Sequence, residues 1–248
     1  MKLILNPEFE NLRSFVEKLP DHFDNEGEVI FKARNEIRKF TVNGVTFTVK
    51  GYKVPLLINR IAYTFFRPSK AERAYKYAGF LLKKGVDTPT PIAYIEISSG
   101  GLFHRSYFIS EYVSYPRLMR EFTGDDFQGR ENILKAFAAF TARLHEQGIL
   151  HLDFSPGNIL FEEKGNNVSF SLVDLNRMRF GTLNAQQCLM NFNRISPSPV
   201  VVEYIVREYA RLRKWDEDAS VEAALREHKE FWYKLEKKNQ AKKRFRSL

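Results

Sequence analysis

The sequence predicts an α+β protein in which short antiparallel strands come first and helices dominate the rest. Between positions 29 and 50, three runs rich in Val, Ile, Phe and Thr follow one another, which is typical of strands. Asn43-Gly44 separates the last two runs and predicts a two-residue hairpin turn, because both residues tolerate a positive φ. From Glu131 to Gln147, apolar residues recur at helical spacing, which predicts a helix with one buried face.

The remaining elements follow from the same patterns. A short helix between Pro7 and Leu19 is expected to carry no chemistry, and the stretch up to Gly27 is a polar link. The expected strands are Val29–Ala33, Ile37–Val42, Val45–Lys50, Ile92–Ile97 and Tyr107–Val113. The expected helices are Ser69–Gly85, Glu131–Gln147, Gln186–Phe192, Val200–Trp215 and Ser220–Lys243.

Length and composition set the outer limits of the fold. With 248 residues, of which 44% are hydrophobic, the chain can bury a sizeable core as one large domain or two lobes. Its only cysteine, Cys188, cannot form an intrachain disulfide, which favours a reducing compartment. We find neither a secretory signal pattern nor an apolar run near the length of a membrane span. We therefore expect a protein that is neither secreted by a visible signal nor membrane-spanning.

The charge of the chain indicates an anionic partner. Lys and Arg number 39 against 30 Asp and Glu, for a net charge of +9. A nucleotide, a phosphorylated glycolipid, a membrane surface or a nucleic acid would each suit this charge, which does not distinguish them. Basic and aromatic residues gather near the C-terminus, which is either a solvated helix or a patch for an anionic leaflet. They are Phe231, Trp232, Leu235, Lys237, Lys238, Lys242, Lys243, Arg244 and Arg246.

The stretch around Asp153 carries the strongest chemical signal. Asp153 and Asn158 lie five positions apart with Pro156-Gly157 between them, so the backbone must turn and both side chains can converge. A second carboxylate, Asp174, follows a short β-prone run and would emerge at a strand end. Phosphoryl transfer needs one carboxylate to orient the acceptor hydroxyl and take its proton, and oxygen ligands for a magnesium–nucleotide. Asp153, Asn158 and Asp174 supply these groups.

The pattern His151-x-Asp153-x-x-x-x-Asn158 followed by Asp174 resembles the catalytic loop and metal-binding aspartate of the protein-kinase-like fold. Ser155 stands where protein kinases acting on Ser or Thr usually have a Lys, so the loop is more similar to small-molecule and sugar kinases. From about Glu28 to about Phe180, the chain most resembles the bacterial lipopolysaccharide core kinases, which phosphorylate Kdo or heptose.

This resemblance implies a two-lobed α+β protein-kinase-like fold. A small antiparallel-sheet lobe with one helix would cover residues 1–111, with 1–27 uncertain, and a mainly helical large lobe would cover 112–248. The implied activity is transfer of phosphate from ATP, with Mg²⁺, to a sugar hydroxyl of the lipopolysaccharide inner core. Asp153 would be catalytic, and Asn158 and Asp174 would hold the metal. The implied partners are a glycolipid and an anionic membrane surface rather than nucleic acid, at the cytoplasmic face of the inner membrane.

The resemblance implies that Glu72 pairs with Lys50, so that Lys50 can hold the α and β phosphates of the nucleotide. Lys50 ends the third strand, on the face opposite to Phe47 and Val49. Glu72 lies in the first turn of the following helix, where Ser69-x-x-Glu72 is also a capping box. The order of strand, Lys, helix and Glu favours a Lys50–Glu72 ion pair over the capping role.

The rest of the expected nucleotide site depends on the main chain. The turn at Arg34-Asn35-Glu36 would cover the phosphates, although it contains none of the glycines found there in protein kinases. Arg34 or the backbone amides of this turn, including that of Asn35, would replace them. Glu111 and Val113 would form the hinge whose main chain meets adenine.

Two neighbours of the catalytic residues have expected structural roles. His151 would hold the loop by hydrogen bonds rather than take part in the chemistry. Asp174 is followed by Leu175-Asn176-Arg177 and not by Phe-Gly, so its backbone should be held more rigidly than in protein kinases.

Two other functions remain open from the sequence. A protein kinase or an antibiotic or other small-molecule kinase would share Asp153, Asn158 and Asp174, although Ser155 argues against a protein kinase. A catalytically inactive nucleotide-binding scaffold is the other class, because the turn at residues 34–36 lacks glycine. The acceptor and the oligomeric state are not encoded in these motifs.

Overall fold

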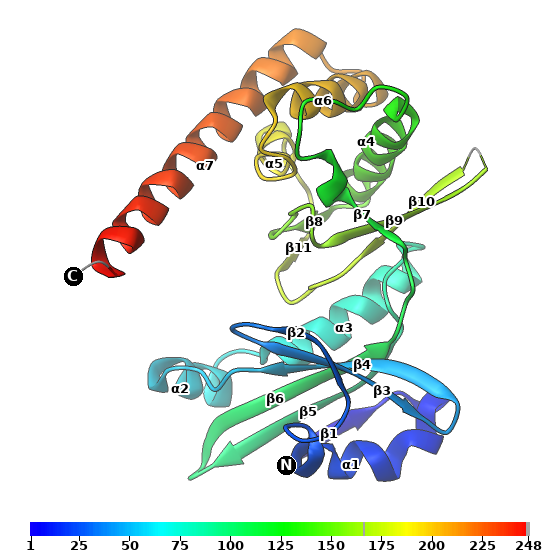
Figure 1. Ribbon diagram of the computed structural model, residues 1–248, viewed down its shortest axis with the longest axis vertical. Coiled ribbons are helices and arrows are strands. Elements are labelled where there is room, and N and C mark those ends of the chain that lie inside the picture. Colours follow the sequence, from blue (N-terminus) through cyan, green and yellow to red (C-terminus); the bar gives the residue numbers. More distant parts are fainter. Residues whose placement is uncertain (166, 247–248) are drawn as a thin grey trace. The chain divides into compact units, whose positions relative to one another are not determined.

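The computed structural model describes the backbone of residues 1–165 and 167–246 and the side chains of these ranges up to residue 242 (Figure 1). The chain divides into two compact units. Unit 1 is Met1–Ser114 with Asp174–Arg177, and unit 2 is Tyr115–Val173 with Met178–Leu248. The segment that contains Asp174 thus belongs to the N-terminal unit although it lies far along the sequence.

Unit 1 is built on one antiparallel sheet of six strands in the order β1-β5-β6-β4-β3-β2 (Figure 1). Its strands are β1 (Lys2–Leu5), β2 (Glu28–Lys32), β3 (Glu36–Val42), β4 (Val45–Tyr52), β5 (Pro91–Ser99) and β6 (Leu102–Glu111). Between β3 and β4, Asn43 and Gly44 have φ values of 51° and 77°, so the predicted hairpin is confirmed. β1 was not expected; it pairs with β5 and forms an edge of the sheet.

Helices cover both faces of this sheet (Figure 1). They are the 3₁₀ helix η1 (Pro7–Leu12), α1 (Arg13–His22), α2 (Leu57–Phe65) and α3 (Lys70–Lys83). Successive side chains of β4 point to opposite faces of the sheet. Phe47 and Val49 join the core that includes α1, whereas Tyr52 packs with Ala71 of α3. Three α-helices thus occur where the resemblance implied one, and α2 had no counterpart in the sequence prediction.

Gly51 shows how closely α1 approaches the sheet. A Cβ at this position would lie 2.7 Å from the ring of Phe23, which follows α1 and is fully buried. Only glycine leaves room for this ring, so Gly51 fixes the distance between the helix and β4.

Unit 2 is mainly helical. Its helices are η2 (Met119–Phe122), α4 (Glu131–Glu146), α5 (Ala185–Met190), α6 (Pro199–Arg213) and α7 (Glu217–Arg246), and its strands are β7 (Arg117–Leu118), β8 (Ile149–His151), β9 (Ile159–Lys164), β10 (Asn167–Leu172) and β11 (Met178–Phe180). α4 supplies the centre of the core, where the Phe137 ring lies 5.6 Å from Phe154 and 5.5 Å from Phe170. Among the described residues, no helix combines the length and apolar character needed to cross a membrane.

Candidate active site

The predicted catalytic loop connects β8 to β9 in unit 2 as a tight turn. Ser155 N–H donates to the Asp153 carbonyl at 2.7 Å, and Asn158 N–H donates to the Ser155 carbonyl at 2.9 Å. The Asn158 side chain closes the turn, because its Nδ2 donates to the Asp153 carbonyl at 2.9 Å. This leaves Asn158 Oδ1 as an oxygen acceptor. The buried Phe154 stacks on Phe137, so the position of Asp153 is fixed from both sides.

Gly157 lies next to the side chain of Arg120 within this loop. A Cβ at Gly157 would meet the guanidinium of Arg120, which would have to move to make room for it.

His151 holds the loop, as predicted. Its ring is buried, with Nδ1 3.0 Å from the Asp153 amide and Nε2 3.1 Å from the Val173 carbonyl. A carbonyl can only accept, so Nε2 carries the hydrogen and Nδ1 accepts from the amide. The neutral ring thereby ties Asp153 to the end of the run that precedes Asp174.

A buried chain of hydrogen bonds supports His151 from behind, and no sequence pattern indicated it. Arg213 donates to the Tyr209 hydroxyl at 2.9 Å, and this hydroxyl lies 3.0 Å from His145 Nδ1. His145 Nε2 lies 3.1 Å from Asn191 Oδ1, and Asn191 Nδ2 donates to the His151 carbonyl at 2.9 Å. Helices α4 and α6 and the residue that follows α5 are thus connected to the base of the catalytic loop.

Stability should fall as this network is acidified. Burial lowers the pKa of His145 from 6.5 to about 4. Between these values the unfolded chain binds a proton that the folded chain does not, so the free energy of unfolding should fall as pH falls from 6.5 to 4. The contribution of His145 to this loss should be about 3 kcal/mol. Denaturant titrations at successive pH values would measure it.

The variant for this measurement is His145→Gln, which removes this buried titration and should reduce the decline over this window. An unchanged slope in His145→Gln would refute the assignment.

The carboxylate of Asp153 has a cationic partner that the sequence did not reveal. Arg194 NH1 donates to Asp153 Oδ1. The Arg194 guanidinium also lies 4.8 Å from the centroid of the Phe231 ring of α7, a cation–π contact that holds it in place. Arg194 lies 41 positions after Asp153 in an irregular segment, so neither spacing nor periodicity could link the two residues.

In unit 1, Lys50 pairs with Asp174. Lys50 Nζ lies 2.7 Å from Asp174 Oδ1, and the two side chains are 15% and 31% exposed. Asp174 has a φ of 59°, a left-handed conformation that Asp adopts more readily than most residues. Asn176 Nδ2 also donates to Asp174 Oδ1, and Arg73 Nε donates to the Asn176 carbonyl at 3.1 Å. The segment after Asp174 is therefore held by side chains, as the absence of a glycine suggested.

The predicted ion pair between Lys50 and Glu72 does not form. The carboxylate of Glu72 lies 3.1 Å from Lys2 Nζ and 2.6 Å from Lys76 Nζ, while Ser69 Oγ caps the helix by accepting from Glu72 N–H at 3.1 Å. Burial opposes ionisation of Glu72, but hydrogen bonds from Lys76 and Lys2 hold its pKa below the ordinary value. The unexpected strand β1 supplies Lys2, which pairs with Glu72. The ammonium of Lys50 pairs with Asp174 instead.

This geometry makes a prediction about activity. Glu72→Gln keeps the backbone N–H that Ser69 caps, and loses ion pairs with two exposed lysines that are worth roughly 0–1 kcal/mol each. Turnover should therefore fall less than about threefold, whereas Lys50→Met, which removes the ammonium beside Asp174, should be severe. Steady-state assays of the two variants measure this difference in turnover. If Glu72→Gln lowers turnover as much as Lys50→Met does, a Lys50–Glu72 pair forms during the reaction.

Lys70 lies near three other cations of unit 1, one of which is Lys50. Burial lowers the pKa of Lys70, and the positive charges of Arg34, Arg73 and Lys50 lower it further, while Asp174 opposes them. These residues come from the β2–β3 turn, β4 and α3 of unit 1. Lys70 and Arg73 were not among the predicted site residues. Lys70 lies two positions before Glu72 and Arg73 directly after it, all in the first turn of α3.

The β2–β3 turn forms without glycine because its backbone does not need one. No residue from 33 to 36 has a positive φ, and the turn is closed by Ala33 N–H donating to the Asn35 carbonyl at 3.0 Å. Asn35 Oδ1 accepts from Lys53 N–H at 3.4 Å. The turn that contains Arg34 therefore forms without glycine.

The expected hinge residues lie at the end of β6 and just after it. Glu111 N–H donates to the Thr90 carbonyl at 2.9 Å, and Tyr112 N–H donates to the Thr46 carbonyl at 3.0 Å. Within the described part of the chain, no intramolecular partner is found for the main-chain groups of Val113. Val113 thus has an N–H and a carbonyl free to bind a ligand.

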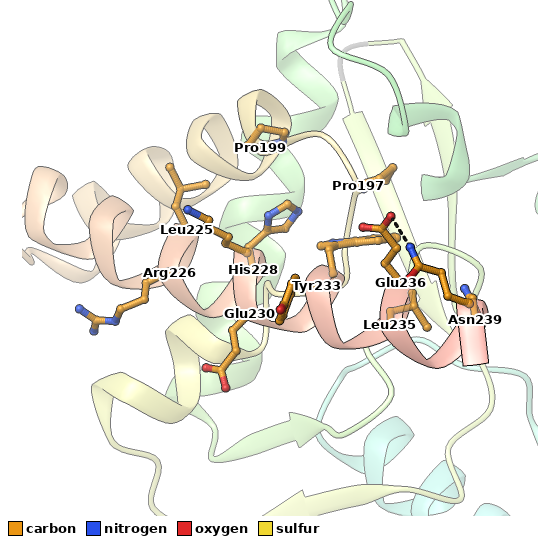
Figure 2. Close-up of a pocket in the computed structure, with 13 residues that line it drawn as sticks. Pro197, Pro199, Leu225, Arg226, His228, Glu230, Tyr233, Leu235, Glu236 and Asn239 are labelled. Atoms are coloured by element: carbon orange, nitrogen blue, oxygen red, sulfur yellow. Dashed lines mark hydrogen bonds between the residues drawn. The ribbon is translucent and has the colours of Figure 1, made fainter. Parts of the chain in front are cut away.

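Unit 2 also contains an open cavity of about 1250 Å³ along α7. Figure 2 shows Pro197 and Pro199 on one side and His228 and Tyr233 of α7 on the other. Trp232 lines it as well, and its Nε1 is buried without a hydrogen-bond partner among the described residues. None of the predicted site residues contributes to this cavity.

Comparisons with known proteins identify the fold and the family. A solved structure described as "WaaP in complex with acyl carrier protein" superposes with a TM-score of 0.62 at 18% sequence identity, over 93% of this chain and 99% of that one. At this identity the match shows the fold, so the predicted two-lobed protein-kinase-like architecture is confirmed. No curated protein matches the sequence.

The family match covers most of the chain. The description "Lipopolysaccharide kinase (Kdo/WaaP) family" fits residues 28–215, a range that includes Lys50, the catalytic loop and Asp174. A kinase family implies the use of ATP. The chain therefore belongs to the lipopolysaccharide kinase (Kdo/WaaP) family and is a phosphotransferase that acts on sugar hydroxyls.

Proposed function

We propose that this protein transfers the γ-phosphoryl group of magnesium–ATP to a hydroxyl of Kdo or heptose in the lipopolysaccharide inner core. The observation that carries the proposal is the fixed carboxylate of Asp153. Its main chain is held by His151 and Asn158, and its side chain by Arg194. A carboxylate positioned in this way is suited to a general base.

Asp153 acts on the acceptor. It accepts the hydrogen of the sugar hydroxyl, whose oxygen attacks the γ-phosphorus while the bond to the β–γ bridging oxygen breaks and ADP leaves. The proton passes to the carboxylate as the new O–P bond forms. Arg194 orients the carboxylate and can shift to the transferring phosphoryl group. In protein kinases, a Lys at the position of Ser155 contacts that group.

The donor atoms of Asn158 and Asp174 fit Mg²⁺. Asn158 donates through Nδ2 to the Asp153 carbonyl, so its Oδ1 is the free atom of the amide. Asp174 uses Oδ1 for Lys50 and Asn176, which leaves Oδ2. Both are oxygen ligands of the kind that Mg²⁺ prefers. When bound, the metal neutralises charge on the phosphates.

The cations of unit 1 hold the nucleotide. Lys50 binds the α and β phosphates, and Arg34 and the Asn35 amide cover them from the β2–β3 turn. Lys70 adds a further charge, since it lies close enough to Arg34 and Lys50 for each to lower its pKa. The main chain at Glu111 and Val113 meets adenine. Glu72 contributes through the position of α3 and not through direct contact with Lys50.

The test is incubation with labelled ATP and purified lipopolysaccharide precursors, with mass analysis of the product. Phosphate on Kdo or heptose, dependent on Mg²⁺ and lost in Asp153→Ala, is the expected result. Phosphate on an aminoglycoside or a protein would favour the other kinase classes. ATP binding without transfer to any acceptor would favour an inactive scaffold.

We also propose an acyl carrier protein as a partner, since the structural neighbour is in complex with one. Co-elution of the two purified proteins on size exclusion would support this, and separate elution at micromolar concentrations would contradict it.

The glycolipid acceptor places the protein at the cytoplasmic face of the inner membrane. The basic residues Lys237, Lys238 and Lys242 on α7 are one source of attraction to that surface. The expected contributions of Lys243, Arg244 and Arg246 concern side chains outside the described residues.

A further inference from the structure

Helix α2 presents an apolar surface to solvent. None of its residues is buried, and the segment that contains it has six large apolar side chains among the exposed ones, up to 81% exposed for Phe66. They are Leu56, Leu57, Ile58, Ile61, Phe65 and Phe66. A single exposed apolar residue needs no explanation, whereas six within eleven positions form a patch that marks an interaction site.

The other side of α2 is anchored to β6. Arg60 Nε donates to the Phe103 carbonyl at 2.8 Å, and Thr64 Oγ1 accepts from Phe103 N–H at 2.8 Å. The Tyr63 ring lies 5.2 Å from the Phe103 ring. The helix therefore has a defined orientation, and its exposure is not the result of a loose attachment.

The exposed residues share one face of the helix. At about 100° per residue, Leu57, Ile58, Ile61 and Phe65 fall within an arc of about 100°. The anchoring residues Arg60, Tyr63 and Thr64 fall on a different arc of the same helix. The most apolar face of α2 is thus turned away from the sheet to which the helix is attached, in contrast to helices of a globular core.

The charge around this face is positive and uncompensated. No Asp or Glu occurs between Glu36 and Glu72, while Lys53, Arg60 and Arg67 flank or lie within α2. In the described residues, none of these three cations forms an ion pair with a carboxylate. Arg60 and Arg67 bond instead to neutral oxygens, of Phe103, Ser99 and Asn59.

We propose that α2 and its flanking residues are an interfacial helix that docks unit 1 on an anionic lipid bilayer. An amphipathic helix with a wide apolar face and basic flanks lies in the plane of the interface, with its apolar side chains at the boundary of headgroups and acyl chains. The positive charges interact with anionic headgroups. The absence of acidic residues over this stretch favours such a surface over a neutral apolar partner.

This inference goes beyond the proposed function, because it assigns a surface that takes no part in phosphoryl transfer. It also differs from attraction through the basic residues of α7 in its dependence on salt. Screening removes attraction between exposed charges, whereas contact of Leu56, Ile58 and Phe66 with acyl chains persists. Binding through α2 should therefore be reduced but not abolished at high ionic strength.

The test uses the full chain and sedimentation with vesicles of equal parts phosphatidylglycerol and phosphatidylcholine. The variant Leu56→Ser, Ile58→Ser, Phe66→Ser replaces the three most exposed side chains of the patch. Its partition onto the vesicles should fall at least about tenfold, because binding scales with the apolar area buried. The matched control Val200→Ser, Leu212→Ser changes exposed apolar residues of α6 in unit 2 and should bind as the wild type does.

A fluorescent probe would locate the contact directly. Cys188 is the only cysteine and is buried, so Ile58→Cys can be labelled selectively with an environment-sensitive dye. Its emission should shift to the blue when the anionic vesicles are added, and that of labelled Leu212→Cys should not.

The contrary outcomes are distinct. If the α2 variant binds vesicles as the wild type does, or if the wild type does not bind them, the proposal is wrong. If the patch instead controls self-association, a change in oligomeric state with unchanged vesicle binding would overturn it in favour of a contact between copies. Turnover of a short sugar acceptor in solution should be equal in wild type and variant, so a failure of the proposed kinase activity would appear separately.

Discussion

Asp153→Ala should lower turnover by roughly 10²- to 10⁴-fold while ATP binding persists, since this range is what a positioned general base contributes. Asp153 accepts the proton of the acceptor hydroxyl and does not contact the nucleotide in the proposed mechanism. The loop itself should survive the change, because its closing bonds use the main chain of Asp153. Steady-state turnover and equilibrium titration with ATP would measure the two quantities independently.

The control for this variant is Asp21→Ala, which removes an exposed carboxylate of α1 and should change neither quantity. Loss of ATP binding in Asp153→Ala would show that the residue serves the nucleotide. Turnover close to that of the wild type would remove Asp153 from the chemistry altogether, and the proposed function would then lose the observation on which it rests.

The catalytic loop could be predicted because its constraints are local. Asp153 and Asn158 act through a turn of five residues, and the His151 ring bonds to an amide two positions away. Residues so close in sequence are brought together by the backbone alone. The same holds for Asn43-Gly44, whose positive φ values are an intrinsic preference of these residues.

The partners of the charged site residues depend on packing between distant segments, and sequence spacing does not report that. Glu72 meets Lys2 because β1 adds to the edge of the sheet beside β5. Asp153 meets Arg194 through a segment without regular structure. In each case the carboxylate was identified from the sequence and its cation was not.

Helix α2 is a different kind of omission. Its apolar residues at positions 57, 58, 61 and 65 have helical spacing, so the periodicity was present. What the sequence could not show is that this face stays exposed, because an amphipathic helix ordinarily turns its apolar face to the core. The exposure becomes visible only once Arg60 and Thr64 are seen to attach a neighbouring arc of the helix to β6.

Asp174→Asn should weaken binding of the magnesium–nucleotide by roughly 10- to 100-fold, the loss expected when one charged ligand becomes neutral. Asn also tolerates the left-handed backbone that this position adopts, with a φ of 59°, so the fold should be retained. In the absence of Mg²⁺ the substitution removes a negative charge from the phosphate site, and ATP alone should bind at least as well as to the wild type.

Lys50→Met provides the contrast, because Lys50 contacts the phosphates themselves. Its loss should weaken ATP binding with and without Mg²⁺, whereas the effect of Asp174→Asn should appear only as Mg²⁺ is added. Lys50 and Asp174 lie 2.7 Å apart, so their contact does not by itself separate the two roles. Titration of both variants with ATP across a range of Mg²⁺ concentrations does. If Asp174→Asn binds ATP with the same dependence on Mg²⁺ as the wild type, Asp174 is only the counter-ion of Lys50, and the metal must be held by other oxygens.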